Sequence, residues 1–104
     1  MADLPAWRVE TSQVLDDPRV PQGTKIELVR AFRFRSFLDA IAFMGKAAPS
    51  IDAMDHHPRW ENVWRTLIVR VTTWDIGHQL SDRDSVLARY FERLYKDFDP
   101  SRRH

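Results

Sequence analysis

The sequence contains no cysteine and no long apolar segment, and these absences narrow what the chain can do. Without thiols it forms no disulfide, has no cysteine nucleophile and offers no cysteine-ligated zinc or iron–sulfur site. No run approaches the roughly 18 apolar residues that a membrane-spanning helix needs. The first residues lack the basic and apolar regions of a signal peptide. We therefore expect a cytoplasmic protein that makes no contact with membranes.

An excess of charge is also lacking. Sixteen basic and fifteen acidic residues give a formal net charge of +1, whereas nucleic-acid-binding domains usually carry a basic patch. The composition thus predicts no nucleic-acid partner. At 104 residues without repeats or low-complexity segments, the chain is expected to form a single domain over residues 1–104.

Two stretches in the first third of the chain alternate apolar and polar side chains, which is typical of half-buried antiparallel strands. The first is Trp7–Val14 and the second is Lys25–Phe34. Between them, Asp16–Gly23 is rich in turn-forming residues and is expected to be a connection. The second stretch would place Ile26, Leu28, Phe32 and Phe34 on one face, and Lys25, Glu27 and Arg33 on the other.

The periodicity then changes to that of a helix. Ser36 and Asp39 have the spacing of a capping box, so we expect a helix from about Ser36 towards Ala53, disturbed near Pro49 and blocked by Pro58. Its apolar stripe would consist of Phe37, Ile41, Met44, Ala48 and Ile51.

The last part of the chain predicts one strand and one helix. Val63–Trp74 is rich in β-branched and apolar residues, as in a central strand, and Gly77–Leu80 is expected to turn the chain. Ser81 and Asp84 form a second capping box. The helix that follows would turn Leu87, Tyr90, Phe91, Leu94 and Phe98 inward. The predicted fold is therefore α+β: an antiparallel sheet with two main helices packed on one face, as a two-layer sandwich.

The segment His56-His57-Pro58 is the strongest candidate for a functional site. Imidazole can both give and take a proton near neutral pH. Pro58 forces His57 into an extended conformation, in which successive side chains point in different directions. One ring could then face a ligand while the other faces support or solvent. This arrangement suits acid–base chemistry on a small molecule.

With its surroundings, this segment resembles the signature of the pterin-4a-carbinolamine dehydratase family. The matching residues are Asp52, His56, His57, Pro58, Trp64, Trp74 and Asp84. The flanks Phe34–Phe37 and Leu80–Asp84 are also similar to the family, and the resemblance spans roughly residues 7–98. Many members carry a third histidine at the position of Trp74, and an indole cannot exchange a proton near neutral pH.

The resemblance implies dehydration of 4a-hydroxytetrahydropterin to quinonoid dihydropterin, in the recycling of tetrahydrobiopterin. It implies His56 and His57 as the catalytic residues and no cofactor or metal. Substrate would be bound by Asp52, Pro58, Trp74, Asp75 and Asp84. Family members commonly form homodimers or homotetramers, and the edges of a sheet containing a strand as apolar as Leu67–Val71 would need to be covered.

Other interpretations of the same residues stay open. His56, His57 and His78 could bind a metal, although adjacent histidines are poor chelators of one ion. Asp84 could simply cap a helix. The chain could also be a weak or inactive member of the family that acts as a protein-binding or assembly module. The histidine pair favours the enzyme, and the tryptophan in place of the third histidine favours the binding module.

Overall fold

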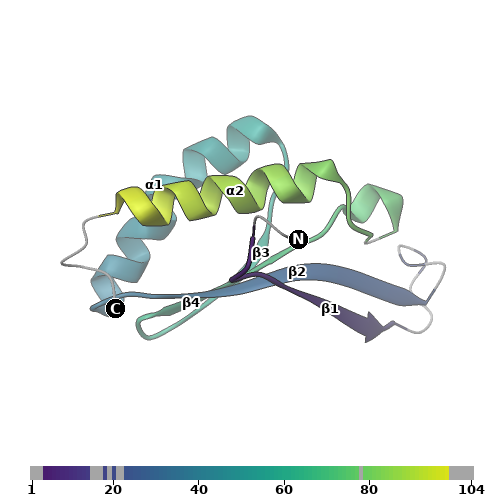
Figure 1. The fold of residues 1–104 in the computed structure, drawn as a ribbon, viewed down its shortest axis with the longest axis horizontal. Coiled ribbons are helices and arrows are strands. Elements are labelled where there is room, and N and C mark those ends of the chain that lie inside the picture. Colours follow the sequence, from purple (N-terminus) through teal and green to yellow (C-terminus); the bar gives the residue numbers. More distant parts are fainter. Residues whose placement is uncertain (1–3, 15–17, 19, 21–22, 78, 99–104) are drawn as a thin grey trace.

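A four-stranded antiparallel sheet forms one layer of the molecule, and two helices form the other (Figure 1). The computed structural model describes residues 4–14, 18, 20, 23–77 and 79–98, without the side chain of Trp74. Along the chain the elements are β1 (Arg8–Gln13), β2 (Thr24–Arg33), α1 (Phe37–Met54), β3 (Arg59–Val63), β4 (Thr66–Val71), a 3-10 turn η1 (Trp74–Ile76) and α2 (Asp82–Asp97). The predicted α+β fold class is confirmed. Much of the connection predicted over Asp16–Gly23 lies outside the described residues.

The strands are arranged in the order β1-β2-β4-β3, so β2 and β4 are central and β1 and β3 form the edges. The register pairs Leu28 of β2 with Val71 of β4. As predicted from alternation, Leu28, Phe32 and Phe34 point towards the helices and are buried. Leu67, Val69 and Val71 of β4 lie on the same side and are also fully buried. The apolar strand Leu67–Val71 is therefore interior, with partners on both sides.

The core-facing stripe of α1 differs from the sequence-based prediction. The buried residues are Ala40, Phe43, Ala47 and Ile51. Of the predicted stripe, only Ile51 is buried, whereas Phe37 is 46% exposed and Ile41 is 41% exposed. The helix is rotated so that its small residues face the aromatic side chains of the sheet, which lets Phe43 pack 5.5 Å from Phe32 between ring centroids. α1 also runs through Pro49, ending at Met54.

The predicted strand Val63–Trp74 is a central strand only over Thr66–Val71 (β4), and its first residues belong to the hairpin that joins β3 to β4. Val63 ends β3, Trp64 and Arg65 form the loop, and β4 covers only Thr66–Val71. Trp64 adopts a left-handed conformation with φ of 53°, which costs a non-glycine residue about 1–2 kcal/mol. The side-chain amide of Asn62 supports the loop by donating to the carbonyls of Trp64 (3.0 Å) and Thr66 (3.1 Å).

Helix α2 follows the prediction closely. Ser81 and Asp84 form the predicted capping box, and Leu87, Phe91 and Phe98 are buried. Tyr90 and Leu94 are partly buried and pack against the core. Within the described part of the chain, neither helix combines the length and the apolar character needed to cross a membrane.

The sheet face opposite the helices is covered by long charged side chains. Val29 is fully buried there because its cross-strand neighbours are Arg8 and Arg70, whose aliphatic stems can cover it. Glu27, predicted to face solvent, is only 2% exposed. Its carboxylate lies 3.4 Å from Arg59, 3.6 Å from Lys25 and 3.8 Å from Arg70. Hydrogen bonds from Arg70 and Arg8 hold the pKa of Glu10 below its ordinary value.

Candidate functional site

The two adjacent histidines lie in the corner between α1 and β3, and their side chains have opposite environments. Asp55 ends α1 in a left-handed conformation with φ of 51°, and its N–H donates to the carbonyl of Asp52 (3.1 Å). After this turn, His56 is buried, with 5% of its side chain exposed, whereas His57 is 57% exposed. The structure therefore separates the pair into one interior and one surface imidazole.

The buried imidazole is held by Asp84. Nε2 of His56 lies 2.7 Å from Oδ1 of this carboxylate, and both groups are shielded from solvent. The other carboxylate oxygen accepts hydrogen bonds from the Thr73 hydroxyl (2.7 Å) and the Ser81 backbone N–H (2.9 Å). A buried charge is tolerated when hydrogen bonds satisfy it on all sides. The network joins the α1–β3 corner, the end of β4 and the start of α2.

Local sequence explains how Asp84 reaches this position. It is the third residue of α2, where a capping-box side chain bonds back to the N-cap backbone. The N-terminus of a helix also favours a negative charge. The same carboxylate thus caps α2, as the structural interpretation of Asp84 predicted, and binds His56.

The exposed imidazole lies beside a pocket of about 320 Å³. Nε2 of His57 is 3.2 Å from Oδ1 of Asp52, and the side chain of Asp52 is 85% exposed. The pocket is lined by Ala48, Ile51, Asp52, His57, Pro58 and Trp60. Its walls are mostly apolar, and its polar groups are a carboxylate and an imidazole, a combination typical of a site for a small molecule.

The remaining predicted site residues lie around η1. Trp74 begins this turn, directly after buried Thr73, and the chain returns at Gln79, whose carbonyl accepts the Thr73 N–H (2.9 Å). Asp75 is exposed and lies 3.4 Å from Nη1 of Arg83. The described lining of the 320 Å³ pocket includes neither Asp75 nor buried Asp84. His78, the third member of the open metal hypothesis, lies outside the described residues.

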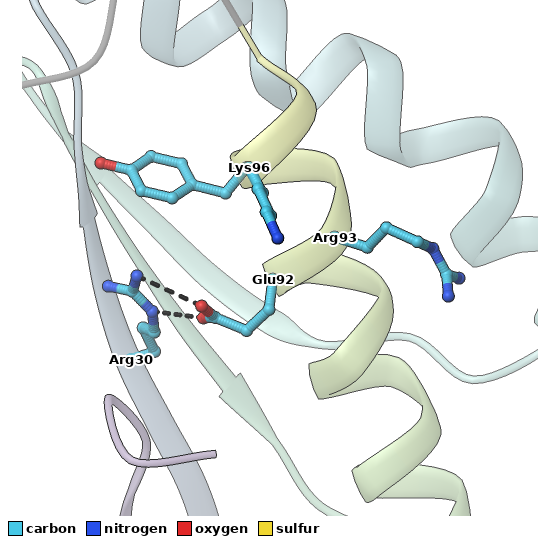
Figure 2. Close-up of a pocket in the computed structure, with 5 residues that line it drawn as sticks. Arg30, Glu92, Arg93 and Lys96 are labelled. Carbon is cyan, nitrogen blue, oxygen red and sulfur yellow. Dashed lines mark hydrogen bonds and ion pairs between the residues drawn. The ribbon is translucent and has the colours of Figure 1, made fainter. Parts of the chain in front are cut away.

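A second pocket, of about 530 Å³, lies between β2 and α2 and is lined by Arg30, Glu92, Arg93, Tyr95 and Lys96. Arg30 points at Glu92 and is hydrogen-bonded to it, while Arg93 extends away from the pair (Figure 2). Glu92 also accepts a hydrogen bond from the indole of Trp7 (2.9 Å). Because Arg30 and Glu92 bind each other, this pocket is a weaker candidate for a ligand site than the pocket beside His57.

Three residues in the site were not predicted from the sequence as functional. Thr73 and Ser81 bind the carboxylate of Asp84, and Arg83 donates to the Asp55 carbonyl (2.7 Å). The sequence indicated Ser81 only as the N-cap of a helix. Arg83 lies in the flank that resembles the family, but no local pattern indicated its contact, and Thr73 had no signal, because their partners are 28 and 11 residues away in the chain.

The geometry supports proton transfer by histidine. A buried carboxylate fixes the orientation of the His56 ring, as in other carboxylate–imidazole pairs. His57 is accessible to a molecule in the pocket. Among the described residues, no group of three or more histidine, aspartate or glutamate side chains is arranged to hold a metal ion.

Comparisons of the chain with known proteins agree on one family. Residues 1–94 match the family model described as pterin 4 alpha carbinolamine dehydratase. A protein of Opitutus terrae, named provisionally as such a dehydratase, is 36% identical over 87 residues, which cover 84% of this chain and 90% of that protein. A protein of Prochlorococcus marinus strain MIT 9313 with the same provisional name is 48% identical over 67 residues, or 64% of this chain and 69% of the relative.

A solved structure is also similar. The crystal structure of a Brucella melitensis protein, titled transcriptional coactivator/pterin dehydratase, superposes with a TM-score of 0.68 at 26% sequence identity. The match covers 90% of this chain and 86% of the other. The fold and the family model therefore agree.

We predict that Asp84→Ala destabilises the protein by about 3–5 kcal/mol, since it leaves the buried imidazole of His56 without its carboxylate partner. The matched control is Asp82→Ala in the same helical turn. Asp82 is exposed, so its loss should cost at most about 1 kcal/mol of helix-terminus stabilisation. Urea unfolding of both variants measures the difference. Equal stability of the two variants would contradict a structural role for the buried network.

Proposed function

We propose a dehydratase function for this chain, which belongs to the pterin 4 alpha carbinolamine dehydratase family. The proposed substrate is 4a-hydroxytetrahydropterin, and the products are quinonoid dihydropterin and water, as in the recycling of tetrahydrobiopterin. The observation that carries the proposal is the exposed imidazole of His57 beside an apolar pocket, next to the carboxylate-held imidazole of His56.

The reaction needs two proton transfers and no change of oxidation state. A proton is delivered to the hydroxyl on C4a, the C4a–O bond breaks, and water leaves. The lone pair of N5 forms the new C4a=N5 double bond, and the proton on N5 passes to a base. One proton is given and one is taken, so imidazoles suffice and neither a metal nor a redox cofactor is needed.

We assign the two proton transfers to His57 and His56. His57 is the group that reaches the pocket directly, with Asp52 at 3.2 Å to orient it. His56 is the second imidazole, and the carboxylate of Asp84 holds its ring in a fixed orientation. A positioned general acid or base contributes about 10²–10⁴-fold to such a step.

The pocket would bind the flat pterin ring by its apolar walls and its carboxylate. Pro58 and Trp60 line it from the β3 side, and Asp52 is placed to accept hydrogen bonds from a polar ring edge. We propose that Trp74 and Asp75 contact substrate from the η1 turn. Asp84 would contribute to binding through His56, because its own carboxylate is fully buried.

The competing proposal is a protein-binding module with little or no catalytic activity. The name of the Brucella melitensis structure includes a transcriptional coactivator. On the present chain, α1 exposes Phe37, Leu38 and Ile41, with Leu38 at 74%. Such an apolar patch is typical of a protein interface. This role would not need His57, so a protein that performs it alone would show no dehydration above the spontaneous rate.

We predict that His57→Ala lowers the rate of dehydration by about 10²–10⁴-fold while the protein stays folded, because the side chain is exposed and packs little. The assay follows the loss of chemically generated 4a-hydroxytetrahydropterin against its spontaneous decay.

The conservative companion variant is His57→Gln, which keeps a polar side chain but cannot exchange a proton near neutral pH. It should be as inactive as His57→Ala. Activity retained by His57→Gln would show that His57 does not transfer a proton. A wild-type rate equal to the spontaneous rate would contradict the dehydratase function itself.

Trp74 generates a further prediction. If its indole stacks on the pterin, Trp74→Ala should raise KM with a smaller change in kcat. Trp74→His should raise kcat, because it adds a proton-transfer group where many family members have one. Steady-state kinetics of the two variants test this. A loss of about 3–5 kcal/mol of stability in Trp74→Ala would instead assign the indole to the core.

Self-association is also expected, as a homodimer or homotetramer. β1 and β3 leave sheet edges to be covered, and α1 exposes the apolar patch of Phe37, Leu38 and Ile41. Light scattering at micromolar concentration should give a mass of at least two chains. A monomer mass would contradict the expectation and leave the dehydratase proposal unaffected.

A further inference from the structure

Arg83 connects the segments that carry the candidate site. Its Nη2 donates a hydrogen bond to the backbone carbonyl of Asp55 (2.7 Å), the residue before the two histidines. Its Nη1 lies 3.4 Å from Oδ2 of Asp75 in η1. Arg83 and Asp84 are neighbours at the start of α2, so one end of this helix holds the backbone at Asp55 and the ring of His56.

The contact to Asp55 acts at a critical turn. Asp55 is one of two non-glycine residues with positive φ in the described chain, and its conformation sets the direction in which His56 and His57 leave α1. Carbonyls at the C-terminus of a helix lack intrahelical partners and carry a partial negative charge. A guanidinium that binds one of them therefore fixes the corner from outside, without occupying the pocket.

The ion pair with Asp75 is the weaker of the two contacts. Both side chains are about half exposed, at 47% and 56%, and the distance is 3.4 Å. Exposed ion pairs are screened by water and contribute little. The charge-assisted bond to the Asp55 carbonyl is the shorter contact, at 2.7 Å.

We propose that Arg83 is a positioning residue for dehydration, acting through the α1–β3 corner on His57. This inference rests on the proposed function. Three of the pocket-lining residues, Ala48, Ile51 and Trp60, lie within α1 or β3 and outside the turn that contains the Asp55 carbonyl. Loss of Arg83 should therefore affect the placement of the proton-transfer group more than the binding of the ring.

The expected effect of Arg83→Ala is a roughly 10- to 100-fold lower kcat with KM changed less than about threefold, because a displacement of about 1 Å of a catalytic group can cost this much. Arg83→Lys should recover only part of kcat, since an ammonium lacks the planar fork that reaches both partners. Added guanidinium ion, at concentrations well below those that denature, should raise the kcat of Arg83→Ala and leave the wild type unchanged.

The matched control is Arg93→Ala, an exposed arginine of the same helix whose side chain extends away from its neighbouring ion pair (Figure 2). It should keep wild-type kcat and KM. Thermal unfolding of all variants separates the proposed role from a purely structural one: a structural role would lower Tm and reduce the active fraction, and free guanidinium would not restore kcat.

A second readout is the pair of ring ¹⁵N signals of His57 in NMR spectra, which should shift in Arg83→Ala and not in Arg93→Ala. Wild-type kinetics in Arg83→Ala, or a loss of activity that follows Tm without rescue, would overturn the inference and leave the dehydratase function standing. A wild-type protein that does not dehydrate 4a-hydroxytetrahydropterin would overturn both.

Discussion

The buried hydrogen bond between His56 and Asp84 is the interaction on which the site depends. It joins a residue after α1 to the first turn of α2, and through Thr73 it includes the end of β4. Removing a carboxylate from water is costly, and here an imidazole, a hydroxyl and a backbone N–H offset that cost together. Because each partner comes from a different element, the bond forms only when both helices have packed on the sheet.

This buried hydrogen bond gives the two neighbouring histidines different environments, one in the interior and one at the surface. Extended backbone before Pro58 turns successive side chains in different directions. With one ring fixed inside, the other must point outward, where the pocket between α1 and β3 lies. A fixed support and an accessible imidazole are features that general acid–base catalysis can use. Arg83 supports the same corner from the solvent side.

Parts of the structure with strong local signals were predictable from the sequence. The α2 capping box and its inward residues follow from spacing alone, as does the inward face of β2. Local signals failed at the β3–β4 hairpin, because its loop contains Trp64 and Arg65 in place of the usual glycine or asparagine. They also failed on α1, which has two possible apolar stripes that share Ile51. Only packing against the sheet selects the stripe that contains Ala40, Phe43 and Ala47.

The sequence by itself determined the class of fold, the start of α2 and the pair His56-His57 with its proline, since each of these is encoded within a few neighbouring residues. It also carried the family resemblance. Only the tertiary structure decided which histidine is buried, that Asp84 is its partner, and that Arg83 holds the corner before them. These contacts join residues 28 apart in the chain. Their formation depends on how two helices pack over one sheet, which no local pattern specifies.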